Sequence, residues 1–233
     1  MLFGYTAQAN MLLLEGALPH QVDQALESFG MNMGPFRMLD LVGLDLGWRA
    51  RKLSGAEAAL PSKISDQLCE QDRFGQKNGK GFYNYTEGSR AANPSPENED
   101  IYKAVSAENG IERREISDEE IVDRCILALI NEGADIIEEG VGQRAVDLDV
   151  VYINGYGFPI WRGGPMHHAN AMGLDVVIEK LNKYREITGN DVYKPSEMLL
   201  KLAESGERLG EAPAKEDRKE KLDFEMSSVA NNF

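Results

Sequence analysis

An internal repeat is the feature that most constrains the fold of this chain. The stretch NMLLLEGALPHQVDQAL in the first half aligns with ADIIEEGVGQRAVDLDVV in the second half, and GPFRMLDLVGLD aligns with GPMHHANAMGLD after a short insertion around YGFPIW. The identical pairs, in chain order, are Glu15 and Glu139, Gly16 and Gly140, Val22 and Val146, Asp23 and Asp147, Gly34 and Gly164, Pro35 and Pro165, Gly43 and Gly173, Leu44 and Leu174, and Asp45 and Asp175. Matches in a constant order are typical of a duplicated structural unit. We therefore expect two similar units, each with a long helix, a second helix and a short helix that begins at a Gly-Pro turn.

Both units are expected to be helical. In the first unit, residues 2–15 place apolar side chains on one helical stripe, namely Leu2, Tyr5, Ala9, Leu12 and Leu13. In the second unit, Ser117 and Glu120 have the spacing of a capping box ahead of a long apolar-periodic segment. The segment DRFGQKNGKGFYNY differs, because its glycine-rich turns and aromatic residues favour a short extended run. The predicted fold class is all-α, with two tandem, duplicated helical domains.

Composition predicts where the two domains begin and end. The stretch TEGSRAANPSPENED is rich in small, proline and acidic residues, which is typical of linkers. The last residues of the chain carry mixed charges with little apolar periodicity, which is typical of a flexible end. We expect a first helical repeat at residues 1–95, a linker at 96–116, a second helical repeat at 117–205 and a charged, flexible tail at 206–233.

The charge of the chain excludes several classes of partner. The formal net charge is −14, which opposes binding to nucleic acid or anionic membranes because phosphate binding needs clustered Lys and Arg. The apolar N-terminus is short and lacks a basic leader, and the C-terminus has no peroxisomal Ser-Lys-Leu ending. Cys69 and Cys125 lie in unrelated contexts and are expected to be reduced core thiols. We therefore expect a cytoplasmic protein without a membrane span, with mitochondrion and peroxisome left open.

Common catalytic and cofactor motifs do not occur in the sequence. It has no Gly-x-Gly-x-x-Gly fingerprint for a dinucleotide, no Walker loop, no Gly-x-Ser-x-Gly and no His-Glu-x-x-His. His167 and His168 are adjacent, so on a helix they point about 100 degrees apart and cannot both bind one metal ion. We therefore expect this chain to hold no catalytic residues, no metal ion and no cofactor.

Three groups of residues remain as candidates for binding or packing. Gly164 and Pro165 have plainer counterparts in the first half, so we interpret them as a packing turn. Arg162 beside Trp161 is expected either to stack on the indole or to hold an acidic group. In the glycine-rich stretch GQKNGKG, the lysines Lys77 and Lys80 could bind a phosphate, or they could lie on a solvated turn with the aromatic residues packed beneath.

Four motifs in order resemble one known family. QANMLLLEGALPHQVDQALESFGMNMGPFRMLDLVGLDLGW, DRFGQKNGKGFYNY, ISDEEIVDRCILALINEGADIIEEG and DVVYINGYGFPIWRGGPM are similar to the C-terminal helical region of 3-hydroxyacyl-CoA dehydrogenase. They most resemble the two tandem C-terminal helical domains of the multifunctional fatty-acid β-oxidation enzyme, which combines enoyl-CoA hydratase and 3-hydroxyacyl-CoA dehydrogenase. The resemblance covers about residues 1–180 and implies the fold of the 6-phosphogluconate dehydrogenase C-terminal type.

The resemblance implies a function that is divided between domains. In the family a Rossmann domain binds NAD, and the helical domains complete the acyl-CoA cleft while the tandem copy mimics a dimer. The family's catalytic Ser, His and Glu belong to the Rossmann domain, and its Asn lies just before the point where this chain begins. We therefore expect the substrate-cleft and assembly region of an NAD-dependent 3-hydroxyacyl-CoA dehydrogenase, inactive alone, with acyl-CoA, a Rossmann-domain segment and a second copy of itself as possible partners.

Within this resemblance only modest substrate contacts can be named. Asn154, just before the GYGFP motif, is a candidate polar contact, and Met33 and Phe36 could line an acyl channel, with core packing as the alternative. Lys77, Lys80 and Arg162 complete the candidate substrate-binding set. Two other functions stay open: a stand-alone helical dimerisation module, and an acyl-CoA-binding protein without catalysis in which the two lysines would matter.

Overall fold

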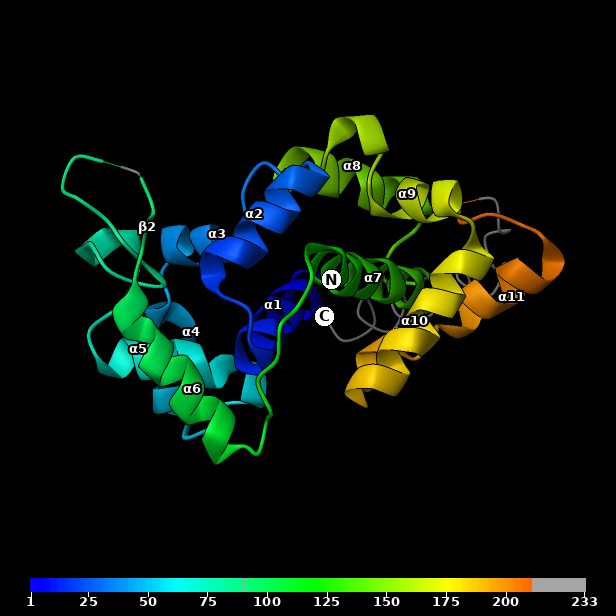
Figure 1. Ribbon diagram of the computed structural model, residues 1–233. Helices are drawn as coiled ribbons and strands as arrows, with labels where there is room; N and C mark the ends of the chain where they lie inside the picture. Colours follow the sequence, from blue (N-terminus) through cyan, green and yellow to red (C-terminus); the bar gives the residue numbers. More distant parts are fainter. Residues whose placement is uncertain (90, 211–233) are drawn as a thin grey trace, which may run out of the picture. The chain divides into compact units, whose positions relative to one another are not determined.

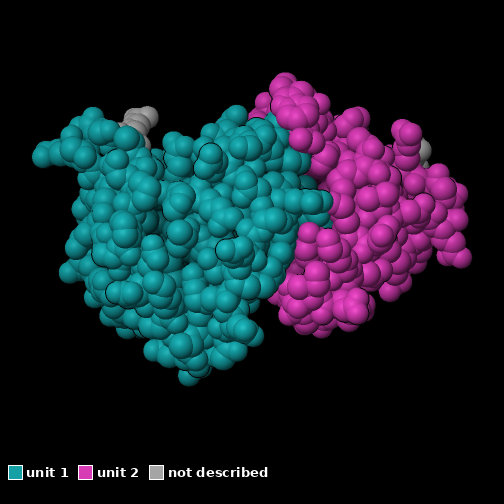
Figure 2. Space-filling view, viewed as in Figure 1, with its two compact units in different colours: residues 1–129, 156–159 teal, residues 130–155, 160–233 magenta. Residues whose placement is uncertain are grey.

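The computed structural model describes residues 1–89 and 91–210, which divide into two compact units (Figures 1 and 2). Unit 1 comprises Met1–Leu129 and Tyr156–Pro159, and unit 2 comprises Ile130–Gly155 and Ile160–Phe233. The predicted all-α class is confirmed, because the described residues are mostly helical and their sheet has two short strands. The tail expected after residue 205 lies, from residue 211 onward, outside the described residues.

Unit 1 holds the first helices of the chain and a small hairpin. Its elements are α1 (Leu2–Glu15), α2 (Pro19–Phe29), α3 (Pro35–Val42), α4 (Asp45–Ser54), η1 (Leu60–Ser62), α5 (Lys63–Glu70), η2 (Gln76–Asn78), β1 (Tyr83–Asn84), β2 (Asn93–Pro94), η3 (Pro96–Asn98) and α6 (Glu99–Glu108). The long helix α7 (Asp118–Glu138) begins in unit 1 and ends in unit 2. Unit 2 continues with α8 (Ala145–Gly155), η4 (Ile160–Arg162), α9 (Pro165–Met172), α10 (Leu174–Thr188), η5 (Asp191–Tyr193) and α11 (Glu197–Ser205).

Helix α1 is the centre of unit 1. The predicted stripe is buried at Tyr5, Ala9, Leu12 and Leu13, whereas Leu2 is only half-buried. The helix ends at Gly16, whose φ of 134° suits glycine, and a Cβ there would lie 2.0 Å from the carbonyl oxygen of Arg114. The burial and the sharp stop together explain why this helix packs closely against η1 and α6.

Each unit contains a turn in which an aspartate accepts hydrogen bonds from the first backbone N–H groups of that unit's third helix. The carboxylate of Asp23 accepts hydrogen bonds from the backbone N–H groups of Phe36 and Arg37, at 2.9 and 3.0 Å. In unit 2 the carboxylate of Asp149 accepts them from Met166 and His167, at 2.7 and 3.1 Å. These bonds occupy orphan donors of the first helical turn, so the predicted duplication and its Gly-Pro turn are confirmed as structure.

The structure corrects one detail of the sequence alignment. The aspartate equivalent to Asp23 is Asp149 and not Asp147, which is half-exposed and pairs with Arg144 at 2.7 Å. The reason is that the loop between α7 and α8 is longer than the loop between α1 and α2, which shifts the register. The pairing of Val22 with Val146 fails for the same reason: Val22 is fully buried and Val146 is 51% exposed.

A second shared contact extends the repeat beyond the aligned sequence. Asp40 on α3 accepts a hydrogen bond from the backbone N–H of Phe82 at 2.9 Å. At the same place on α9, Asn170 accepts one from the N–H of Leu209 at 3.0 Å and donates one to its carbonyl oxygen at 2.9 Å. Leu209 is buried like Phe82, so the packed part of unit 2 extends past residue 205 to Leu209, where a flexible tail was expected.

The linker expected at 96–116 is wrong in its first part. Helix α6 occupies Glu99–Glu108 and buries Ile101, Tyr102 and Val105 while it packs against α1 and α5. Its apolar residues follow helical spacing, but the Pro, Ser and Asn residues just before them suggested a linker. After α6 the chain runs along unit 1, and the side chain of Gln21 donates a hydrogen bond to the carbonyl oxygen of Ile116 at 2.7 Å.

A buried ion pair fastens α7 to α1. Arg124 is only 1% exposed, and its guanidinium donates two hydrogen bonds to the carboxylate of Glu15, at 2.6 and 2.7 Å. At the start of α7, the N–H of Glu120 donates to the hydroxyl of Ser117 at 3.2 Å, which confirms one half of the predicted capping box. The carboxylate of Glu120 binds Arg114 and Arg124.

Two further expectations concern thiols and membranes. Cys69 and Cys125 are both buried and unbridged, as the sequence predicts. Burial raises the pKa of each thiol to about 12, so neither is a nucleophile at neutral pH. In residues 1–89 and 91–210 no helix is both long and apolar enough to cross a membrane.

Candidate functional site

An apolar groove in unit 1 is the feature most suited to a ligand. We call it the α1–α4 groove; it is lined by Phe3, Ala7 and Asn10 of α1 and by Val42, Leu46 and Arg51 around α3 and α4. Phe3, Val42 and Leu46 are 71%, 63% and 69% exposed. A folded chain rarely leaves several large apolar side chains exposed around one groove unless the surface binds something.

Local structure explains why these side chains are exposed together. The buried stripe of α1 faces the core, so Phe3 and Ala7 lie off that stripe. Gly43 ends α3 with a φ of 101°, a conformation that favours glycine, and the chain turns directly into α4. This turn places Val42 and Leu46 along the same groove.

The groove also contains a buried hydrogen-bond acceptor. Asn10 is 5% exposed, and its side-chain nitrogen donates to the carbonyl oxygen of Thr6 at 2.9 Å. Its side-chain oxygen is buried and accepts no hydrogen bond within the described residues. Arg51, which also lines the groove, pairs with Asp66, with one N–O distance of 3.0 Å. The groove is therefore apolar with one unsatisfied acceptor in its wall.

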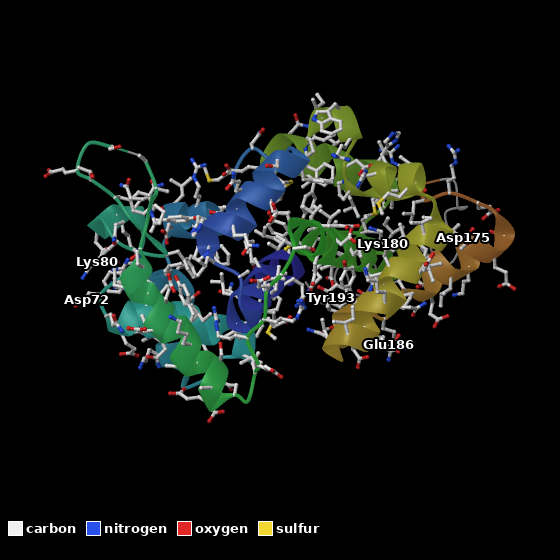
Figure 3. All side chains as sticks on the ribbon, viewed as in Figure 1. Asp72, Lys80, Asp175, Lys180, Glu186 and Tyr193 are labelled. Carbon is white, nitrogen blue, oxygen red and sulfur yellow. The ribbon has the colours of Figure 1, made fainter. Side chains whose placement is uncertain are left out.

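The two candidate lysines lie in and just after η2, and the side chain of Lys77 reaches Gly43, which lines the groove. The ammonium of Lys77 forms an ion pair with Asp45 and lies 6.0 Å from the centre of the Phe74 ring. The hydrogen bond from Lys77 is the main reason that the pKa of Asp45 falls below its usual range. Lys80 reaches the carbonyl oxygen of Gln71 at 3.4 Å (Figure 3). The pair with Asp45 offsets much of the positive charge that an anion would need.

The aromatic run after these lysines packs onto two buried aspartates. The hydroxyl of Tyr83 donates to Asp23 at 2.7 Å, and the hydroxyl of Tyr85 donates to Asp40 at 2.9 Å. Desolvation raises the pKa of Asp23 to about 7 and that of Asp40 to about 6, against the hydrogen bonds that favour their ionised forms. These carboxyl groups anchor the hairpin, in agreement with the interpretation in which the aromatic residues pack beneath the turn.

The proposed acyl-channel residues have different surroundings. Phe36 is fully buried, and its ring centre lies 4.6 Å from that of Phe82. It therefore packs in the core, the alternative that the sequence left open, and a ligand cannot reach it without a rearrangement of unit 1. Met33 is half-buried in the loop between α2 and α3.

The remaining candidates, Asn154 and Arg162, lie in unit 2. The guanidinium of Arg162 lies 4.1 Å from the ring centre of Trp161, so of the two alternatives it is the stacking that the structure contains. Asn154 is exposed at the end of α8 and donates to the carbonyl oxygen of Val150 at 2.8 Å. Four of the six candidates belong to unit 1 and two to unit 2, so neither unit gathers all six into one site.

Residues 156–159, the first part of the insertion around YGFPIW, pack within unit 1. The carbonyl oxygen of Gly157 accepts a hydrogen bond from the N–H of Asn32 at 2.9 Å. The ring of Phe158 is 2% exposed and meets the edge of Phe29 with the ring centres 5.8 Å apart. Residues 156–159 therefore stabilise the start of the α2–α3 loop, and no chemical role is needed to explain them.

Sequence reasoning missed the α1–α4 groove. Its signal was present in the apolar residues that fall outside the buried stripe, above all Phe3, and in Val42 and Leu46 on either side of Gly43. Spacing along the chain could not show that α1 and α4 lie on either side of one groove.

Comparison with known proteins gives the family. Residues 1–85 and 121–216 match the model of "3-hydroxyacyl-CoA dehydrogenase, C-terminal domain". The chain belongs to this family. The two matched ranges correspond to the two copies of the repeat, so the 3-hydroxyacyl-CoA dehydrogenase C-terminal domain is present twice.

Full-length relatives are longer than this chain. It is 43% identical over 222 residues to the peroxisomal bifunctional enzyme of Danio rerio and 44% identical to that of Homo sapiens, with 88% of this chain and 31% of each relative covered. It is 33% identical to the fatty acid oxidation complex subunit alpha of Shewanella sp. (strain MR-7), with 85% of this chain and 28% of the relative covered. The chain thus spans about a third of the length of these relatives.

Solved structures agree with the family assignment. The dehydrogenase part of multifunctional enzyme 1 from C. elegans matches with a TM-score of 0.69 and 30% identity, over 85% of this chain and 45% of that one. The 3-hydroxybutyryl-CoA dehydrogenase of Escherichia coli matches with a TM-score of 0.62 and 19% identity, over 88% of this chain and 58% of that one, which shows the shared fold alone.

The described residues do not fit a dinucleotide such as NAD. A dinucleotide site needs a parallel strand, a glycine-rich turn and a helix N-terminus that meets the pyrophosphate. The described part of this 3-hydroxyacyl-CoA dehydrogenase domain pair has only the antiparallel strands β1 and β2, paired as Tyr83 with Pro94 and Asn84 with Asn93. No group of three metal-binding side chains occurs in residues 1–89 and 91–210 either.

Proposed function

We propose that this chain forms the substrate-cleft and assembly region of an NAD-dependent 3-hydroxyacyl-CoA dehydrogenase of fatty-acid β-oxidation. The reaction converts 3-hydroxyacyl-CoA to 3-oxoacyl-CoA, with NAD bound by a Rossmann domain of the same enzyme. The observation that carries this proposal is the match of both copies of the repeat to the C-terminal domain of that dehydrogenase.

The α1–α4 groove is the part of this chain that we assign to the acyl group. Its exposed apolar side chains suit a hydrocarbon chain, and each fully buried Leu or Phe side chain contributes about 1.5–3 kcal/mol of hydrophobic free energy. The side-chain oxygen of Asn10 can accept a hydrogen bond from an amide or hydroxyl of the substrate. The chain contributes binding and orientation to the reaction, while the proton and hydride transfers belong to residues of the Rossmann domain.

Two variants on one helix test the groove. Leu46→Asp places a charge in the groove, and we expect octanoyl-CoA to bind about 10-fold more weakly or worse, which corresponds to the loss of one buried apolar side chain. Leu53→Asp is the matched control, because Leu53 is 90% exposed on the same helix and does not line the groove. Isothermal titration of both variants measures the change, and equal loss of binding in both would contradict the assignment.

The activity itself is tested by following the absorbance of NADH at 340 nm with acetoacetyl-CoA as the substrate. We expect no NADH oxidation by the purified chain alone, and oxidation when the chain is joined to the nucleotide-binding part of a relative. A rate with the chain alone, retained after further purification, would show that a complete catalytic set is present here and would contradict the division of labour that we propose.

A non-catalytic acyl-CoA-binding protein is the alternative with a sequence feature of its own. It depends on Lys77 and Lys80, and the ion pair between Lys77 and Asp45 speaks against a free phosphate site. If that alternative holds, replacing both lysines with Ala weakens acyl-CoA binding in the absence of NADH. A dimerisation module instead predicts tight self-association, which analytical ultracentrifugation measures.

The place of the protein in the cell is also a proposal. Its relatives are named as peroxisomal enzymes or as subunits of bacterial fatty acid oxidation complexes. We propose a cytoplasmic location, and a fluorescent fusion expressed in the source cells distinguishes it from peroxisomes or mitochondria.

A further inference from the structure

Asn10 is a buried polar residue that the fold of the repeat does not explain. It lies in the middle of α1, although asparagine is a weak helix former. Because Glu15 aligns with Glu139 in the repeat, Asn10 aligns with Ala134, which is fully buried. The second copy of the domain therefore builds the same long helix with an alanine at this place, and the packing of the repeat does not require an asparagine.

The hydrogen bonds of Asn10 are incomplete. Its side-chain nitrogen donates to the carbonyl oxygen of Thr6 at 2.9 Å, whereas its side-chain oxygen is buried and accepts no hydrogen bond within the described residues. An acceptor that is buried without a donor destabilises the protein, so such a group in a folded chain needs an explanation. Asn10 lines the α1–α4 groove, and a donor on a ligand in that groove would complete its hydrogen bonds.

The other polar residues of the groove favour an uncharged ligand group. Ser62 and Ser65 also line the groove and are half-buried, and Ser62 makes no capping hydrogen bond at the start of α5. The charge of Arg51 is paired with that of Asp66. A carboxylate in the groove would therefore find no free counter-charge there and would repel the side-chain oxygen of Asn10. A neutral hydroxyl can donate to Asn10 and can also exchange hydrogen bonds with the serine hydroxyls.

We propose that the α1–α4 groove selects acyl-CoA substrates whose acyl chain carries a hydroxyl group in addition to the one at C3, and that this second hydroxyl donates to Asn10. The inference rests on the proposed function: if the acyl group fills the groove, the donors of the pantetheine arm lie beyond the thioester and outside it. Along α1, Phe3 and Asn10 are about 10 Å apart at the rise of a helix, so an acyl chain of medium length reaches from one to the other. A site that hydrogen-bonds a substrate hydroxyl discriminates against the analogue that lacks it.

A series of octanoyl-CoA derivatives tests the proposal by isothermal titration of the intact chain. Octanoyl-CoA is compared with 5-, 6-, 7- and 8-hydroxyoctanoyl-CoA and with octanedioyl-CoA, whose chain ends in a carboxylate. We expect one of the hydroxylated esters to bind about 5-fold more tightly than octanoyl-CoA, and octanedioyl-CoA to bind no more tightly than octanoyl-CoA. No gain from a hydroxyl at any of the four positions, or tightest binding by octanedioyl-CoA, would overturn the proposal.

Asn10→Ala tests whether Asn10 is the acceptor. Alanine is the residue of the second copy at this place, so we expect the helix to form. The variant should bind octanoyl-CoA like the unchanged chain and should lose the preference for the hydroxylated ester. Asn182→Ala makes the same change at an exposed position of α10 and should keep the preference. A preference that survives in Asn10→Ala, or an equal loss of both esters, would overturn the role of Asn10 as the acceptor.

The Leu46→Asp variant separates a failure of this inference from a failure of the proposed function. If octanoyl-CoA binds, Leu46→Asp weakens its binding and no hydroxyl improves it, then the groove holds the acyl group without selecting a hydroxyl, and only this inference is wrong. If no CoA ester binds, or if Leu46→Asp binds octanoyl-CoA like the unchanged chain, then the assignment of the groove to the acyl group is wrong and this inference is overturned with it.

Discussion

Single residues show how strongly burial changes the contribution of an ion pair to stability. Arg124 and Glu15 are held together by two hydrogen bonds, and Arg124 has almost no contact with solvent. Removing one partner of such a pair leaves the other charge buried and unpaired, which costs about 3–5 kcal/mol. Exposed pairs such as Lys103 with Glu99 are screened by water and contribute at most about 1 kcal/mol.

The first prediction follows from this contrast. We expect Glu15→Gln to lower the free energy of unfolding by up to about 3 kcal/mol, measured by urea denaturation, because the guanidinium of Arg124 loses the closer of two counter-charges and keeps Glu120, at 3.3 Å. The control is Lys103→Gln, with an expected change below about 1 kcal/mol. Similar losses in the two variants would mean that the buried pair contributes no more than a surface pair.

Asp23 gives a second prediction at the same scale. Its pKa is about 7 in the folded state and 3.8 as the reference value, so the folded protein binds the proton more tightly than the unfolded chain. Stability is therefore present at about pH 4 and is lost as the pH rises towards 7, by up to about 1.4 kcal/mol per pH unit. We expect Asp23→Asn to flatten this slope in urea titrations between pH 4 and 7. An unchanged slope would assign the pH dependence to other groups, such as Asp40.

At the scale of elements, the Gly-Pro turn and the aspartate above it form one packing device that occurs twice. A Cβ on Gly34 would lie 2.3 Å from the Cβ of Asp23, and a Cβ on Gly164 would lie 2.4 Å from the Cβ of Asp149. Helices α2 and α3, like α8 and α9, approach each other closely because these glycines have no side chain. The same closeness allows the aspartate to reach the first N–H groups of the third helix.

A pair of alanine substitutions tests this device. Gly34 has an ordinary φ of −71°, so Gly34→Ala introduces only a steric conflict, and we expect it to destabilise unit 1 by about 1–3 kcal/mol. Gly4→Ala is the control within helix α1, where an added Cβ meets nothing within 4 Å. It should stabilise the protein by about 0.5–1 kcal/mol, because Ala is the better helix former. Thermal unfolding measures both, and a neutral Gly34→Ala would show that α2 and α3 can move apart without cost.

At the scale of the whole molecule, the net charge of −14 opposes folding through self-repulsion. The Debye length falls from about 30 Å at 10 mM salt to about 8 Å at 150 mM, so salt screens this repulsion much more than it screens the buried pair of Arg124 and Glu15. We expect the Tm to rise by about 2–4 °C between these salt concentrations, which corresponds to about 1 kcal/mol. A lower Tm at 150 mM would mean that surface ion pairs outweigh the repulsion.

The sequence by itself determined the features that depend on short-range pattern. Helical periodicity predicted α1 and α7, the Gly-Pro turns predicted α3 and α9, and the ordered repeats with their family resemblance predicted the duplicated 3-hydroxyacyl-CoA dehydrogenase C-terminal domain. The stacking of Arg162 on Trp161 was predictable because the two residues are neighbours in the chain.

Only the tertiary structure decided which residues meet across the fold. It shows that Asp149, and not Asp147, binds the second Gly-Pro turn. It also shows that α6 packs within unit 1 and that the N–H of Leu209 donates a hydrogen bond to Asn170. It also brought α1 and α4 to one groove and placed the hydroxyl of Tyr83 against the carboxylate of Asp23. The physical reason is the same in each case: loop length and burial depend on contacts between residues far apart in the chain, and local patterns do not record them.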